Sequence, residues 1–315
     1  MQIENINVIK KCAPNKEYTN NSCFSYESLI EIAKNYNKKN NNNKIDINLS
    51  KEDLVKELEI RLSDKCSDQI CWLRHEIVKE LRNKDINLYT FRPIGPNKQY
   101  EWLNTININE VIDQYHKLYP EFLYLGAVPS DFEDIHILGI SNLNFDELRK
   151  NNKYKIGLVI NLDEHYKSGS HWVGLFFNLK EYQIYYFDSV GKPPIKRIKL
   201  FINKIIKYFY YKKFNNHLHI NNLLDKLTKF IKNKNTADEL NKYNIIYNNI
   251  ISNIDIKYNN IQHQYKNSEC GVYSINFIIR IINGESFNDI ITNPTSDDEI
   301  NKYREVYFRN VKIKN

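Results

Sequence analysis

The chain has 315 residues, of which 42% are hydrophobic, and a formal net charge of +7. This length and apolar fraction support one large domain or two modest ones, and they exclude wholesale disorder, a collagen and a disulfide mini-protein. The chain is rich in Asn, Ile, Lys and Tyr, which have A/T-rich codons and therefore indicate a nucleotide-biased genome. Only 9 of the 45 basic residues are Arg. A surplus that consists mainly of Lys argues against specific nucleic-acid recognition and leaves non-specific DNA contact open.

The chain carries no apolar run of the roughly 20 residues that a membrane-spanning helix needs. Its N-terminus, residues 1–11, also lacks the apolar segment of a signal peptide. Five cysteines, an odd number in a long chain, do not indicate a disulfide framework, so we expect a reducing, intracellular setting. The spacing of four of them fits no zinc template. We predict that these four, Cys12, Cys23, Cys66 and Cys71, are buried structural thiols. We expect no metal and no cofactor.

Residues 1–90 are predicted to form a helical N-terminal arm. A good N-cap at Ser50, with an acidic residue three positions later, starts the clearest helix. Further helices are expected over 25–36 and 68–81, with a polar surface loop at 37–44. The segment 91–96 contains two prolines and a glycine, which favours a linker, and the second domain is therefore placed at 91–315.

Strands and helices are mixed in this second domain. Strands are predicted over 156–162, 171–177, 182–188 and 254–258, and helices over 195–211 and 270–282. A stretch rich in Asn and Lys, 214–252, is interpreted as an insertion. The pattern predicts an α+β fold, with a mixed central sheet flanked by helices and preceded by the helical arm.

The hairpin formed by strands 171–177 and 182–188 places a histidine against an aspartate. The two strands are joined by four residues, a length that suits a hairpin. If Phe177 pairs with Tyr182, paired positions sum to 359, and His171 lies directly opposite Asp188. Opposed side chains have Cβ atoms about 4.5–5.5 Å apart, within reach of a hydrogen bond between imidazole and carboxylate. The pair either only satisfies polar groups at a strand end or forms part of a catalytic site.

Cys270 opens the apolar helix predicted over 270–282. The partial positive charge at a helix N-terminus stabilises a thiolate. Gly271 allows close approach of the backbone to a substrate, and Gln264 offers a side-chain amide to an oxyanion. In isolation such a cysteine would be a small buried hydrophobe. Together with the opposed histidine and aspartate, it predicts nucleophilic acyl transfer.

The order of these motifs resembles a known superfamily. His171-Trp172, then Asp188 seventeen residues after the histidine, then Gln264 and Glu269-Cys-Gly271 are similar to the adenovirus protease and the ubiquitin-like-protein-specific proteases. Within that superfamily, the chain resembles the polyprotein-processing thiol proteases of nucleocytoplasmic large DNA viruses, such as the African swine fever virus protease and its giant-virus relatives. The resemblance implies a ubiquitin-like-protease-type core behind a helical arm. Glu269 replaces the Asp that is usual in cellular members, which disfavours a SUMO protease.

The resemblance also implies a mechanism and a substrate. Cys270 would attack the scissile bond to form a thioester, with His171 as the acid and base and Asp188 orienting the imidazole. Gln264 and the Cys270 amide would hold the oxyanion. Substrate binding would involve Gly271 and also Trp172, which would cover a narrow channel and so favour cleavage after Gly-Gly-type sequences. The implied substrates are viral structural precursors in the virion or in viral factories of the host cytoplasm, with no membrane partner; oligomeric state is not predicted.

Two other functions remain open at this point. One is a deubiquitinase or SUMO-type isopeptidase of an intracellular pathogen, and the other is a catalytically inactive binding adaptor. His165, six residues before His171, is a rival base that we interpret as a surface histidine. Asp163 and Glu164 lie in the same loop, where we expect them to be solvated, with Asp163 a candidate to line the cleft.

Overall fold

The computed structural model describes residues 12–214 and 254–310. Their contacts divide them into two compact units. The first, the helical unit, contains the described residues within Met1–Glu101, Glu110–Leu118 and Lys302–Asn315. The second, the sheet unit, contains those within Trp102–Asn109 and Tyr119–Asn301. The insertion predicted at 214–252 lies outside the described residues, apart from its first residue.

The helical unit begins with a series of capped helices. They are α2 (Tyr26–Lys39), α3 (Lys51–Leu62), α4 (Gln69–Trp72), α5 (Glu76–Lys79) and α6 (Lys84–Tyr89). Ser50 caps α3 as predicted, because its hydroxyl accepts a hydrogen bond from the Asp53 amide. The prediction of a single helix over 68–81 is wrong. Asp68 caps the N-terminus of α4 and His75 caps that of α5, so this stretch forms two short helices.

Four cysteines of the helical unit are paired in disulfides, which contradicts the prediction of unpaired structural thiols. Cys12 pairs with Cys23 and Cys66 with Cys71, with Cα–Cα distances of 5.2 and 5.4 Å. Both distances suit a disulfide. The number and spacing of cysteines cannot show which Cα atoms the fold brings this close. Cys270 is buried and is the free cysteine of the chain.

The sheet unit is built on a five-stranded mixed sheet in the order β1-β2-β3-β4-β5. The outer pairs, β1–β2 and β4–β5, are parallel, and the two inner pairs are antiparallel. The strands are β1 (Phe122–Pro129), β2 (Lys155–Asn161), β3 (Trp172–Asn178), β4 (Gln183–Phe187) and β5 (Asp255–Tyr258). The predicted α+β class and mixed sheet are confirmed, and β1 is an additional strand that the sequence analysis did not include.

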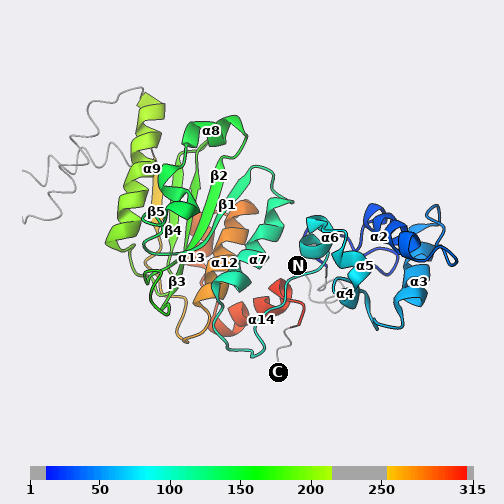
Figure 1. Cartoon of the computed structure of the whole chain (residues 1–315). Helices are drawn as coiled ribbons and strands as arrows, with labels where there is room; N and C mark the ends of the chain where they lie inside the picture. The colour runs from blue at the N-terminus through cyan, green and yellow to red at the C-terminus, as the bar shows by residue number, and fades with distance from the viewer. Residues whose placement is uncertain (1–11, 215–253, 311–315) are drawn as a thin grey trace, which may run out of the picture. The chain divides into compact units, whose positions relative to one another are not determined.

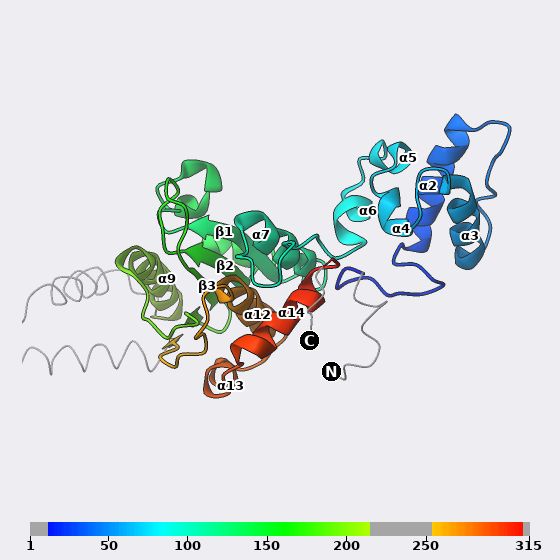
Figure 2. The same cartoon turned by 90° about the horizontal axis from the view of Figure 1, so that it is seen from below.

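Two helices cover opposite faces of this sheet, α9 (Lys196–Phe214) and α12 (Cys270–Ile282) (Figure 1, Figure 2). On the α9 face, Leu175 and Tyr186 pack in one buried cluster with Phe201. On the α12 face, Gly174 of β3 leaves space for the ring of Phe277, and a Cβ at this position would lie 2.4 Å from that ring. The sheet is therefore buried on both sides, and α12 lies close against its centre.

The other helices within 12–214 and 254–310 are α7 (Thr105–Asp113), α8 (Phe145–Lys150), α13 (Phe287–Thr292) and α14 (Asp297–Tyr307), with single 3₁₀ turns at Gln114–His116, His136–Leu138 and Ile140–Asn142. Among the described residues, no helix combines the length and the apolar character needed to cross a membrane.

The register of the central hairpin differs from the predicted one by two residues. Asn178 pairs with Gln183 and Gly174 with Phe187, so paired positions sum to 361 rather than 359. The turn explains the difference, because the Asn178 side chain accepts hydrogen bonds from the backbone of Lys180 and Glu181. This interaction places Asn178 at the end of the strand and outside the loop. A slip of two residues keeps every side chain on its predicted face.

Candidate active site

The structure brings the predicted histidine and aspartate together just beyond the ends of their strands. His171 immediately precedes β3, and Asp188 immediately follows β4. Because of the shifted register the two residues are not directly opposed, yet His171 Nε2 lies 2.7 Å from Asp188 Oδ1. The Asp188 side chain is fully buried and that of His171 is 17% exposed. The imidazole is therefore held at one nitrogen, which leaves the other to face a reacting group.

Asp188 is fixed by the backbone amide of Val190 and by the side chain of Asn259, the residue that follows β5. The Asn259 side chain accepts a hydrogen bond from the Asp188 amide at 2.7 Å and donates one to the Asp188 carbonyl, also at 2.7 Å. The Val190 amide donates to Asp188 Oδ1 at 2.9 Å. The buried Asn259 was not identified from the sequence, because an asparagine in an Asn-rich chain carries no distinguishing pattern.

The electrostatics of His171 favour the protonated ring. Burial alone would lower its pKa, but hydrogen bonding to the side chains of Asp188 and Cys270, together with their negative charges, raises the pKa from 6.5 to about 9. Cys270 is thus the second side chain that interacts with this imidazole. A histidine that is positively charged at neutral pH and lies beside a thiol stabilises the thiolate form of that thiol.

Cys270 is the first residue of α12, as predicted, and is 3% exposed. The helix runs for 13 residues, so its N-terminal partial charge acts on the thiol. The preceding carboxylate, that of Glu269, is fully buried. It accepts hydrogen bonds from the amide and the hydroxyl of Ser268, at 3.0 and 2.6 Å. These donors offset the desolvation of a charge directly beside the nucleophile.

Gln264 is buried close behind the aspartate. Its Oε1 accepts a hydrogen bond from the Ser189 hydroxyl at 2.6 Å, and its Nε2 donates to the Lys266 carbonyl at 2.6 Å. Its backbone amide donates to the Ser189 carbonyl at 2.8 Å. The side-chain amide is thus fixed at both ends. An NH₂ group has two hydrogens, and only one of them is used by Lys266.

Leu103 contacts both Gly271, at the start of α12, and Trp172, the residue after His171. A Cβ at Gly271 would lie 3.0 Å from Leu103 Cβ, so a glycine beside the nucleophile lets this segment pack closely. The Leu103 carbonyl in turn accepts a hydrogen bond from Trp172 Nε1 at 2.9 Å. Trp172 is only 7% exposed. The Leu103 segment therefore runs beside the nucleophile and fixes the indole of Trp172.

A groove of about 350 Å³ extends from this point, and both Trp172 and Trp102 line it. Trp102 is 48% exposed and was not predicted to have a role, although a tryptophan is a distinctive residue in a chain that has only three. The other lining residues are Leu103, Asn104, Thr105, Pro129, Asn161, Asp163, Glu164, His165, Lys167, Ser168 and Gly169. Asp163 therefore lines the groove, as the sequence analysis suggested.

The rival histidine belongs to a different pair. His165 Nδ1 lies 2.5 Å from Asp131 Oδ2, and the His165 side chain is 59% exposed. It therefore lies at the surface, as predicted, although it lines the groove. Burial opposes ionisation of Asp131, but hydrogen bonds from His165 lower its pKa overall. The described residues contain no group of three or more His, Cys, Asp or Glu side chains that could hold a metal ion.

Comparison with known proteins finds sequence similarity over nearly the whole chain. Residues 151–311 match the model of the Ulp1 protease family, C-terminal catalytic domain. The chain is 36% identical over 320 residues to a thiol protease of Acanthamoeba polyphaga mimivirus, covering 95% of this chain and 93% of that protein. The chain belongs to the Ulp1 protease family. It is therefore a thiol protease, and all the residues of the predicted triad lie inside the matched region.

Solved structures give the same fold. A crystal structure of the African swine fever virus protease matches with a TM-score of 0.60 at 20% identity, covering 98% of this chain and 99% of that one. A selenomethionine form of the same protease matches with a TM-score of 0.54 at 20% identity, covering 95% and 96% of the two chains. The structural similarity to the African swine fever virus protease thus extends over nearly the whole length of both chains.

Proposed function

We propose that this thiol protease is an endopeptidase that cleaves after Gly-Gly-type sequences, with Cys270 as its nucleophile. The observation that carries the proposal is the hydrogen-bonded pair of His171 and Asp188, together with the buried free Cys270, which interacts with the same imidazole from the N-terminus of α12. Family membership accounts for the class of reaction. The hydrogen bond and the burial of these side chains support the assignment of His171, Asp188 and Cys270 to that reaction.

The chemistry follows from the arrangement of the three side chains. Cys270 Sγ attacks the scissile carbonyl carbon, whose oxygen becomes an oxyanion. The protonated His171 ring, oriented by Asp188, then gives its proton to the leaving amine as the C–N bond breaks. A thioester remains. Water, deprotonated by the now neutral His171, attacks that thioester and regenerates the thiolate and the imidazolium.

The proposed oxyanion donors are the Cys270 amide and the second Nε2 hydrogen of Gln264. Removal of one oxyanion donor commonly costs about 2.7–4 kcal/mol of transition-state stabilisation. Gln264 suits this role because Ser189 and Lys266 fix its amide, so little reorganisation is needed when the charge develops.

The proposed specificity for small residues rests on the groove. Trp172 is immobilised by Leu103, and Trp102 lines the same groove. Two indole rings that line one groove would limit the room for substrate side chains, and glycine has no side chain to accommodate. Glycines just before the scissile bond would therefore fit beneath Trp172, and Gly271 would keep the adjacent backbone close to the substrate. The similarity to viral proteases favours a viral structural precursor as the substrate, cleaved during particle maturation.

The test is processing of a Gly-Gly-containing precursor by the wild type and by Cys270→Ala, with N-terminal sequencing of the products. The wild type should produce one new N-terminus directly after the glycines, and the alanine variant should produce none. Cleavage by the alanine variant would exclude Cys270 as the nucleophile. Cleavage elsewhere would exclude the Gly-Gly specificity, and labelling by a ubiquitin or SUMO vinyl sulfone without precursor cleavage would favour an isopeptidase.

A further inference from the structure

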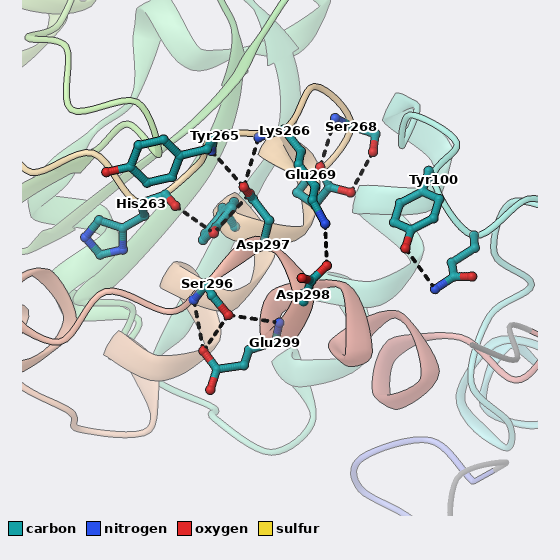
Figure 3. Close-up of polar contacts among 12 residues, drawn as sticks. Tyr100, His263, Tyr265, Lys266, Ser268, Glu269, Ser296, Asp297, Asp298 and Glu299 are labelled. Carbon is teal, nitrogen blue, oxygen red and sulfur yellow. Dashed lines mark hydrogen bonds and ion pairs between the residues drawn. The ribbon is translucent and has the colours of Figure 1, made fainter. Parts of the chain in front are cut away.

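The loop that carries Gln264 is held by a carboxylate from a distant part of the chain. Asp297, the first residue of α14, accepts hydrogen bonds at Oδ2 from the backbone amides of Tyr265 and Lys266, at 2.8 and 2.9 Å. Figure 3 shows this carboxylate facing the two amides. Asp297 is 7% exposed. Charge-assisted hydrogen bonds to a buried carboxylate are the stronger kind, so they fix this backbone firmly.

Capping of its own helix does not explain the direction of the Asp297 side chain. Ser296 and Glu299 already form a reciprocal capping pair at the start of α14. The Ser296 hydroxyl accepts a hydrogen bond from the Glu299 amide at 3.3 Å, and Glu299 Oε2 accepts one from the Ser296 amide at 3.0 Å. The Asp297 carboxylate is therefore free to act on the loop rather than on its own helix.

Tyr273 adds a second link between the same segments. Its hydroxyl lies 2.8 Å from the Thr295 carbonyl, 3.2 Å from the His263 carbonyl and 3.3 Å from Asp297 Oδ1. Burial and the charge of Asp297 raise the pKa of Tyr273 well above its usual range, so the hydroxyl keeps its proton. Tyr273 lies in the first turn of α12, three residues after Cys270. The Tyr273 hydroxyl thus links the start of α12 to the loop that carries Gln264 and to Asp297.

The link from Asp297 to Gln264 passes through Lys266. The amide of Lys266 donates to Asp297, and its carbonyl accepts the hydrogen bond from Gln264 Nε2 at 2.6 Å. The position of that carbonyl sets the orientation of the glutamine amide, and hence the direction of its second hydrogen. We propose that Asp297 is a positioning residue for the oxyanion hole, acting on Gln264 through the backbone of Lys266. This inference rests on the oxyanion role proposed for Gln264.

Two reactions of Cys270, alkylation and addition to an aldehyde, depend differently on the oxyanion hole. Alkylation of Cys270 by iodoacetamide forms an S–C bond at a saturated carbon and expels iodide, so no oxyanion develops. A peptide aldehyde instead adds to Sγ and turns its carbonyl oxygen into one that occupies the hole. Asp297→Ala should therefore lower kcat for a Gly-Gly peptide about 10- to 100-fold. It should weaken aldehyde inhibition by a similar factor, and it should leave KM and the alkylation rate nearly unchanged.

Matched variants serve as controls. Asp298→Ala removes the neighbouring carboxylate, which is 72% exposed and pairs with the Lys266 ammonium, and it should behave as wild type. Asp297→Asn keeps an oxygen that can accept from both amides and should restore most of the activity. If Asp297→Ala fails to fold, then Asp297→Glu, which keeps the charge but displaces the oxygens by one methylene, should show the same selective loss.

Two results would overturn the inference. One is an Asp297 variant that is folded and retains wild-type kcat and aldehyde affinity. The other is a variant that loses alkylation rate and aldehyde affinity to the same extent, which indicates general disruption of the site. Gln264→Ala tests the underlying proposal separately, because unchanged aldehyde affinity in that variant would refute the role of Gln264 itself. If both residues act as proposed, the double variant should lose no more than Gln264→Ala alone.

Discussion

The raised pKa of His171 predicts where activity is lost at alkaline pH, and Asp188→Asn is the perturbation that tests it. The asparagine keeps an oxygen for the imidazole but removes the charge. In the wild type, the interactions of His171 with Asp188 and Cys270 outweigh burial and raise its pKa from 6.5 to about 9. At 1.36 kcal/mol per pKa unit, the net stabilisation of the imidazolium is about 3 kcal/mol.

The direction of the pH dependence follows from which protonation state of the His171 ring is active. Protonated His171 supplies the proton to the leaving amine, so kcat/KM should fall as pH rises through about 9. Loss of one nearby opposite charge typically changes a pKa by about 1–3 units, so the alkaline limb of Asp188→Asn should move to roughly pH 6–8. The folded-state pKa of His171 exceeds the unfolded value. Its stabilisation of the fold is therefore complete below pH 6.5 and is lost as pH rises through about 9.

The assay is kcat/KM for a Gly-Gly peptide over a pH series, which reports groups of the free enzyme. Asp131→Asn is the control, because Asp131 pairs with the other histidine of the region, His165. Its alkaline limb should remain at the wild-type position. A wild-type limb near pH 6.5, or a limb that Asp188→Asn does not move, would refute the proposed coupling of the charges.

Three further predictions concern packing, the disulfides and the groove. Gly174→Ala should lower the free energy of unfolding by about 1–3 kcal/mol in urea titrations, because the new methyl would meet Phe277; wild-type stability would contradict the close packing of α12 on the sheet. Replacing Cys12 and Cys23 by Ser should lower the free energy of unfolding by about 2–3 kcal/mol, and an unchanged midpoint under oxidising conditions would contradict the disulfide. Trp102→Ala should raise KM for a Gly-Gly peptide and leave iodoacetamide alkylation of the nucleophile unchanged, whereas an unaltered KM would remove Trp102 from the substrate site.

The parts of the fold that were predictable are those with strong local signals. The helix that begins at Cys270 is predicted to the residue, because a mostly apolar segment follows a polar one. The hairpin was recognised, but its register was not, since the Asn178 side chain bonds to the turn and moves the four-residue loop one position along the chain. Strand β1 and the helices α7 and α14 were not predicted individually.

The candidate site was predictable to the extent that its residue types are chemically distinctive. His171, Asp188, Cys270 and Gln264 were selected because their side chains suit acyl transfer. The residues that hold them were not selected, since Asn259 and Asp297 act through backbone amides that the fold alone brings within reach. The disulfides were missed for the same reason. Pairing depends on distances between chain segments, which spacing along the sequence does not determine.

The central claim is that Cys270 is a nucleophile activated by His171, and one labelling experiment tests it most directly. A Gly-Gly peptide vinyl sulfone is reacted with the full chain near neutral pH, and the adduct is located by peptide mass spectrometry. The account predicts one adduct, on Cys270, with a rate that falls by orders of magnitude in His171→Ala. An adduct on another residue, or an equal rate in His171→Ala, would contradict it.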